Sequence, residues 1–243
     1  MKHARGFTLT ELAVVMVIIG FLVVSGIVAL NAQVEQRNYD ETQRRLNAAV
    51  DAVLAYAVVN RRLPCPAVTG ATGVEARSDG TVAAGGNCTT SYGGFLPAET
   101  LGFAYVDASR YGVDAYNNRI RYAVASNITG CSGPSALPHF TSVANLKANG
   151  VSCRPSGLEV CTSAACAARV VSTETAAFIV FSTGKNGAFA GSQGDDEVEN
   201  TNGNGTFVSR TPGTTDAAAF DDIMAVVPVG VLYARLIAAG VLP

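Results

Sequence analysis

The stretch MKHARGFTLTELAVVMVIIGFLVVSGIVAL, residues 1–30, decides the fold of this chain. It opens with a short basic leader and continues from Leu12 to Leu30 as an apolar run of 19 residues without a charge. A helix of that length spans roughly 28 Å, about the thickness of the hydrocarbon core of a bilayer. Glu11 stands directly before the run, where a carboxylate needs a partner. We therefore expect a membrane helix over residues 7–30 with a functional glutamate.

The order of residues around this junction resembles a known processing signal. Gly6-Phe7-Thr8-Leu9-Thr10-Glu11, followed by a charge-free helix, resembles the start of type IV pilins and type II secretion pseudopilins. The resemblance implies that a prepilin peptidase/methyltransferase cuts between Gly6 and Phe7 and methylates the new amine. It also implies an assembly contact, because an incoming Phe7 amine can meet the Glu11 carboxylate of a neighbouring subunit. Each subunit then supplies one charge and accepts the other.

A secretory signal peptide and a plain membrane anchor are the two alternatives for this segment. A secretory signal has its cleavage site after the apolar stretch, and residues 31–35 offer no convincing site. A plain anchor would not account for the Gly6-Phe7 junction or Glu11. The basic leader predicts a cytoplasmic N-terminus and an external C-terminal domain. The resemblance implies a single-pass protein of the bacterial inner membrane that later enters a periplasmic pseudopilus or an extracellular pilus.

Beyond the apolar run the sequence predicts one continuous helix from Thr10 to Asn60, without a glycine or proline break after Leu30. Its second half is amphipathic, and it should end before Pro64, which disfavours helical geometry in the preceding residue. The expected organisation is a leader at 1–6, a transmembrane and assembly helix at 7–30, its amphipathic continuation at 31–60 and an external α+β domain at 61–243. The apolar positions of the amphipathic part are Tyr39, Leu46, Val50, Val53, Leu54 and Ala57.

The C-terminal domain is predicted to pair the helical spine with an antiparallel sheet and disulfide-bearing loops, a pilin-like α+β fold. Residues 64–100 are rich in glycine and proline and are expected to be loops. Strands are expected at 119–125, 177–182 and 223–227, and a short helix at 229–239. Three stretches resemble elements of major pseudopilin domains: Asp114–Tyr122, Phe181–Gly187 and Asp221-Asp222-Ile223.

Six cysteines lie outside the leader and the apolar run, an even number that favours disulfides in an exported chain. Six cysteines allow fifteen connectivities, so the sequence does not fix the pairing. Pairing of sequence neighbours is expected, since each such pair encloses a loop rich in glycine or serine. Zinc is the rival, but there is no Cys-x-x-Cys pair and one histidine after the leader, His139. The expected pairs are Cys65 with Cys88, Cys131 with Cys153 and Cys161 with Cys166.

An acidic cluster near the C-terminus is the candidate metal site. Calcium takes six to eight oxygen ligands on flexible loops, and the resemblance implies calcium in the corresponding loop. The alternative is a solvated acidic loop, and the spacing fits no EF-hand. No cofactor is required, and calcium is the one metal that the cluster would suit. The candidate ligands are Asp195, Asp196, Glu197, Glu199, Asp221 and Asp222.

Other chemistry finds little support. The formal charge of −2, which becomes −4 when Lys2 and Arg5 leave with the leader, is too small to indicate nucleic acid or anionic lipid. Gly184-Lys185 lacks the upstream glycine of a phosphate loop. Nothing resembles a nucleophile elbow, so no enzyme is expected. The pair Arg61-Arg62 is expected to end the helical spine and to oppose its dipole.

The sequence therefore predicts a structural subunit of a type II secretion pseudopilus or a type IV pilus. Its partners would be the prepilin peptidase/methyltransferase, other pilin or pseudopilin subunits and an inner-membrane assembly platform. Many major pilins have a proline partway along the N-terminal helix, and its absence here favours a minor or specialised subunit. The alternative is a pilin-anchored binding module, such as an adhesin or a DNA-uptake receptor, with its ligand surface in the loops 64–100 and 128–170.

Overall fold

The structure is a computed structural model. It describes residues 8–70, 72–78, 86–126, 138–154, 157–171, 175–187, 193–213 and 220–242, and over residues 23–29 only the helical backbone. The chain divides into two compact units, residues 1–41 and residues 42–243.

The helix α1, Leu9–Asn60, runs through both units and confirms the predicted spine to within one residue. From Thr42 onward one stripe of α1 is buried, and the stripe recurs at three- and four-residue steps, as expected for a helix that covers a core. Leu46, Val53, Leu54 and Ala57 were expected in this stripe, whereas Tyr39 is 37% exposed. The helix stops at Asn60 because Arg61 adopts a left-handed backbone, with φ of 55°.

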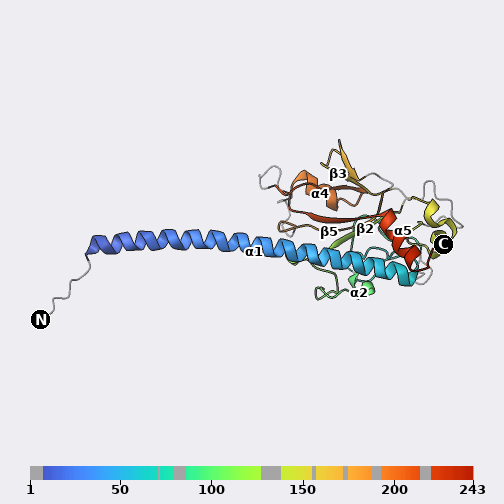
Figure 1. The fold of residues 1–243 in the computed structure, drawn as a ribbon, viewed down its shortest axis with the longest axis horizontal. Coiled ribbons are helices and arrows are strands. Elements are labelled where there is room, and N and C mark those ends of the chain that lie inside the picture. Colours follow the sequence, from blue (N-terminus) through green and yellow to red (C-terminus); the bar gives the residue numbers. More distant parts are fainter. Residues whose placement is uncertain are drawn as a thin grey trace. The chain divides into compact units, whose positions relative to one another are not determined.

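Four strands form an antiparallel sheet in the order β1-β2-β5-β7. Every residue of β5 is buried, because both faces of the sheet are covered. Figure 1 shows the part of α1 from Thr42 onward with α5 on one face and α4 with β3 on the other. Burial on both faces explains why this strand is a continuous apolar run instead of alternating. The strands are β1 Gly94–Phe95, β2 Arg121–Val124, β5 Ala176–Ser182 and β7 Ile223–Pro228.

A second, three-stranded sheet has the order β4-β3-β6, and its β3–β6 pair is parallel. The prediction of a purely antiparallel sheet was therefore incomplete. Each of these strands has three residues, too few to show a period in the sequence. The strands are β3 Glu159–Cys161, β4 Arg169–Val171 and β6 Thr206–Val208.

Short helices complete the second unit. In α3 the side chain of Ser142 caps the first turn by accepting a hydrogen bond from the backbone N–H of Asn145. The helix α5 packs against β5 and β7 and confirms the predicted C-terminal helix. The remaining helices were not predicted. Their bounds are α2 Ala98–Leu101, α3 Val143–Asn149, the 3₁₀ turn η1 Gly150–Ser152, α4 Asp195–Thr201 and α5 Val229–Ala238.

The three predicted strands correspond to β2, β5 and β7, each shifted by at most two residues at an end. Within the part of the chain that the structure describes, no helix combines the length and hydropathy required of a membrane span. The span over residues 7–30 stays a prediction.

Candidate functional site

Three carboxylates meet where β5 ends and β7 begins. The antiparallel pairing of Ser182 with Ile223 places Asp221 and Asp222 beside the turn that follows β5. Glu197 reaches the same place from α4. One carboxylate oxygen from each of these three acidic residues lies within 4.8 Å of the others. The β5–β7 register fixes the positions of Asp221 and Asp222, and α4 brings Glu197 to them.

The turn after β5 holds Asp221 through its backbone. The N–H groups of Lys185 and Asn186 donate to Asp221 Oδ2 at 3.1 and 3.2 Å. Gly184 has a left-handed φ of +62°, and a Cβ at this position would collide with Asp221 Oδ1. The glycine is therefore required both by the backbone and by the close approach of the carboxylate.

Glu197 ties α4 to this turn. Its Oε1 accepts a hydrogen bond of 2.7 Å from the Asp221 N–H, and its Oε2 accepts 2.8 Å from the Asn186 amide. Asp222 Oδ2 accepts 2.7 Å from the side-chain amide of Asn200, also on α4. The Asn186 amide was missed in the sequence, where asparagine beside glycine signals only a turn.

One oxygen of Asp221 and one of Asp222, Oδ1 in each case, is buried without a hydrogen-bond partner. Burial raises the pKa of Asp222 to about 8 and that of Asp221 to about 6, and the neighbouring carboxylates add to both shifts. Buried, unsatisfied anionic oxygens are costly. A hard divalent cation takes such oxygens as ligands and offsets most of their negative charge. The three carboxylates therefore fit a calcium-type ion.

Three of the six predicted ligands are not part of this cluster. Asp196 pairs with Arg210 at 2.7 Å. Glu199 accepts a hydrogen bond of 2.8 Å from the Asn204 amide, and Asp195 is exposed. The prediction of one acidic loop was wrong here, because the residues belong to a helix. Consecutive helical side chains point about 100° apart, so only one of three neighbours can face the site.

At the N-terminus, Gly6 and Phe7 lie outside the described residues. Glu11 is exposed and accepts hydrogen bonds of 2.8 Å from both the backbone N–H and the hydroxyl of Thr8. The Glu11 N–H donates to the Thr8 hydroxyl oxygen at 3.3 Å. This is a capping box, in which the side chain of each residue accepts a hydrogen bond from the backbone N–H of the other. The spacing Thr8-Leu9-Thr10-Glu11 contains the signal for it, which the prediction of a helix from Thr10 missed.

Two of the three expected disulfides are present, Cys65–Cys88 and Cys161–Cys166. Cys153 is also disulfide-bonded, and its expected partner Cys131 lies outside the described residues.

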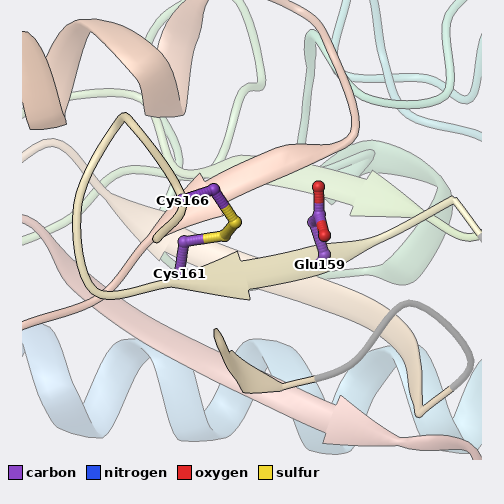
Figure 2. Close-up of side chains that lie close together, drawn as sticks. All are labelled: Glu159, Cys161 and Cys166. Atoms are coloured by element: carbon purple, nitrogen blue, oxygen red, sulfur yellow. A yellow bond between two sulfur atoms is a disulfide. The ribbon is translucent and has the colours of Figure 1, made fainter. Parts of the chain in front are cut away.

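Glu159 lies beside the Cys161–Cys166 bridge on β3 (Figure 2). Because the sulfurs are bonded to each other, they are not thiolate ligands. The Glu159 carboxylate is used by Arg169 at 2.7 Å and by the Thr206 hydroxyl at 3.0 Å. This group of three is therefore structural.

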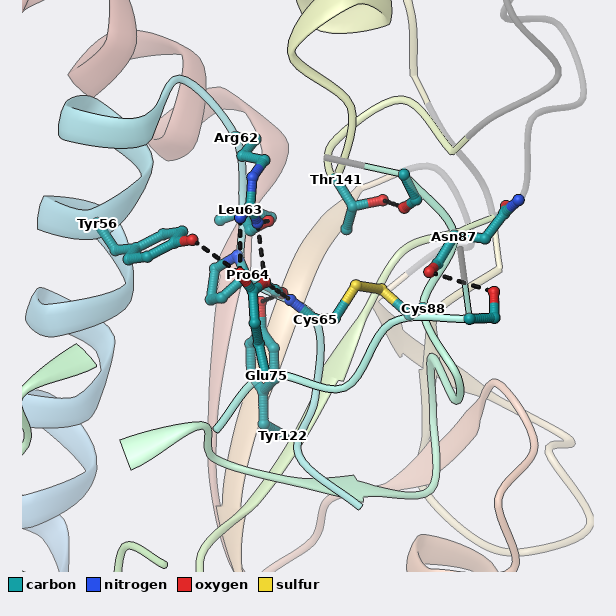
Figure 3. Close-up of a disulfide and its surroundings, with 12 residues drawn as sticks. Tyr56, Arg62, Leu63, Pro64, Cys65, Glu75, Asn87, Cys88, Tyr122 and Thr141 are labelled. Carbon is teal, nitrogen blue, oxygen red and sulfur yellow. Dashed lines mark hydrogen bonds and ion pairs between the residues drawn. A yellow bond between two sulfur atoms is a disulfide. The ribbon is translucent and has the colours of Figure 1, made fainter. Parts of the chain in front are cut away.

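The Cys65–Cys88 bridge adjoins a buried ion pair (Figure 3). Arg62 donates two hydrogen bonds to Glu75, of 2.6 and 2.9 Å, and the side chains are 2% and 4% exposed. Glu75 also accepts from the Cys65 N–H at 3.1 Å and from the Tyr56 hydroxyl at 3.2 Å. Burial alone would raise the pKa of Glu75, but Arg62 outweighs it and the pKa is lowered. The expectation that Arg62 opposes the helix dipole is thus wrong, because the residue lies beyond the helix and pairs with Glu75.

Residues 1–27 match the prokaryotic N-terminal methylation motif. This motif is the prepilin-type signal of type IV pilins and pseudopilins, so the resemblance found in the sequence is confirmed for this segment. No curated protein and no solved structure gives a significant match to the chain.

Proposed function

We propose, from the methylation motif at residues 1–27, that this chain is a structural subunit, minor or specialised, of a type II secretion pseudopilus or a type IV pilus. The motif supports a pilin-like precursor that is processed by prepilin peptidase and assembles with other pilins. A pilin-type motif indicates a structural protein rather than an enzyme. The long helix α1 joined to an α+β domain with disulfides agrees with such a subunit.

The proposed sequence of events starts at the membrane. Peptidase cleavage between Gly6 and Phe7 removes the basic leader and frees an amine. The apolar part of α1 holds the subunit in the inner membrane, with the domain outside the cytoplasm. Transfer into a filament, at an assembly platform, lets the amine of one copy meet the Glu11 carboxylate of another. Because the charge is then paired, burial of Glu11 among helices becomes tolerable.

The capping box gives Glu11 a role before assembly. While the subunit is alone, Thr8 satisfies the Glu11 carboxylate. An incoming ammonium group offers a stronger, charge-assisted partner for the same oxygen. Glu11 would therefore exchange a local helix contact for an intermolecular one during assembly.

The experiment is mass spectrometry of the N-terminus, followed by an assembly assay of Glu11→Val. We expect the mature chain to start at a methylated Phe7, and Glu11→Val to be cleaved and yet to enter filaments poorly. Glu35→Val is the matched control, because this carboxylate is on the same helix beyond the apolar run. An intact Met1, or normal incorporation of Glu11→Val, would contradict the proposal.

We also propose that Glu197, Asp221 and Asp222 bind calcium and fix α4 against the sheet. The orphaned buried oxygens of Asp221 and Asp222 support this proposal. The ion would offset most of the negative charge of the cluster and stabilise the turn that follows β5. Its role would be stability of the external domain and not catalysis.

A further inference from the structure

A cavity of about 430 Å³ opens where the chain leaves α1. A volume in this range is typical of a binding pocket. Its floor is apolar and comes from α3 and from the residues after α5, while its rim carries two cations. The floor residues are Val143, Leu146, Val241 and Leu242, and the cations are Arg61 and Lys147.

The two rim cations are available to a ligand. Both are exposed, and neither makes an ion pair or a hydrogen bond through its side chain within the described ranges of the chain. They consequently do not cap the helix carbonyls nearby. A cavity with an apolar floor and two cations at the rim fits a short apolar side chain that is flanked by carboxylates.

The helix α4 presents such a group on its outer side. Asp195 is exposed and Val198 is 49% exposed, and Glu199 follows on the same helical face. The inner side of α4 is occupied, because Glu197 enters the carboxylate cluster and Asn200 bonds to Asp222. The contacts of the inner side therefore hold the outer side in a fixed direction.

The helix α4 covers the face of the four-stranded sheet away from α1 (Figure 1), whereas the cavity is lined by the residue after α1, by α3 and by the residues after α5. Both belong to the compact unit of residues 42–243, in which different elements supply them. A contact between them joins two copies through unlike surfaces. Repetition of such an interface gives a ring if the rotation between successive copies closes. Otherwise it generates a helical filament.

We propose that the cavity at Arg61 and Lys147 receives the outer face of α4 from a second copy of this chain. Val198 enters the apolar floor, and Asp195 and Glu199 face the two cations. The inference rests on the proposed function, since it names a domain contact between successive subunits. The contact is separate from the one at Glu11, which belongs to the N-terminal helix.

The test uses the full-length chain in detergent micelles with the photo-crosslinker p-benzoylphenylalanine in place of Val198. We expect a crosslinked dimer whose adduct lies on residues 143–147 of the other copy, identified by peptide mass spectrometry of mixed isotope-labelled chains. Lys147→Glu should reduce the dimer yield about fivefold, as expected for loss of an exposed charge pair. Combining Lys147→Glu with Asp195→Lys should restore most of it. Arg154→Glu reverses an exposed cation outside the cavity and should leave the yield unchanged.

The outcomes separate this inference from the proposed function. An adduct elsewhere, no dimer, or failure of the double reversal to restore the yield overturns the docking contact. If Glu11→Val still abolishes filament entry in that case, the proposed function stands without it. If Glu11→Val assembles like wild type, the proposed function fails while a mapped adduct on residues 143–147 would still support the contact.

Discussion

Two buried charged groups in the unit of residues 42–243 differ in how their charge is balanced. Arg62 and Glu75 form a neutral pair, and the Glu75 carboxylate is fully used by Arg62, Tyr56 and the Cys65 N–H. Glu197, Asp221 and Asp222 bring three acids together and leave two oxygens without hydrogen bonds. The charges of Arg62 and Glu75 are therefore balanced without a further ligand. The negative charges of Glu197, Asp221 and Asp222 are balanced only when the cluster takes up protons or binds a cation.

The largest expected effect comes from breaking the buried ion pair of Arg62 and Glu75. Arg62→Leu should lower the free energy of unfolding by about 3–5 kcal/mol, because it leaves Glu75 buried without its cation. Denaturant unfolding of the purified protein measures the loss. The double variant Arg62→Leu/Glu75→Leu should be less destabilised than the single one. If the single and double variants lose the same stability, the pair is not the support described above.

The next largest effect is expected from calcium binding to Glu197, Asp221 and Asp222. At a calcium concentration of about 100 times Kd, binding should add about 2.7 kcal/mol and raise Tm by roughly 5–10 °C relative to a chelator. Asp222→Asn should abolish this response, because the amide supplies no charge. Asp195→Asn, an exposed acid on the same helix, should keep it. A wild-type Tm that millimolar calcium leaves unchanged would rule out the ion.

A smaller effect separates the cost of backbone strain at Gly184 from the cost of crowding Asp221. Gly184→Ala should be destabilising by about 2 kcal/mol beyond Gly102→Ala, since overpacking adds to the strain. Both glycines have φ near +60°, but a Cβ at Gly102 would meet nothing within 4 Å. Thermal unfolding of both variants with and without calcium gives the comparison. Equal losses would show that Asp221 moves away freely.

The smallest effect concerns His139, a buried imidazole whose pKa is lowered in the folded protein. Burial lowers the pKa of His139 to about 4, and its Nε2 lies 3.0 Å from the Tyr233 hydroxyl. As the pH falls below 6.5 the unfolded chain takes up the proton first, so the stability from neutral His139 is present above pH 6.5 and is lost towards pH 4. The loss between pH 6.5 and 5.5 should be about 1 kcal/mol.

The measurement for His139 is the difference in Tm between wild type and His139→Gln as the pH is lowered. The two proteins share every other titrating group, so the difference isolates the imidazole. We expect the wild type to lose stability faster than the variant over this range. Parallel curves would mean that His139 takes up its proton at an ordinary pH in the folded protein.

Some of the fold was predictable because its signal is local. The continuous helix α1 follows from uninterrupted helical character over 52 residues, and β5 and β7 follow from apolar runs bounded by turn residues. The strands β3, β4 and β6 were not predicted. With three residues each, they exist because neighbouring segments provide partners, and pairing at a distance leaves no period in the sequence.

The candidate site shows the same limit at the level of side chains. All three carboxylates of the cluster were among the predicted ligands, but nothing in the sequence distinguishes Glu197 from Asp195, Asp196 and Glu199. Only the helical rotation of α4 separates them, and only the β5–β7 register brings Asp221 and Asp222 to Glu197.

The sequence by itself determined the prepilin-type signal at residues 1–27 and the length of the spine, because each depends on contiguous residues. The tertiary structure decided which acids lie together, which carboxylate pairs with Arg62 and which residues line the cavity beside α3. Those properties depend on residues far apart in the chain, and their positions are fixed only when the sheet and the helices pack together.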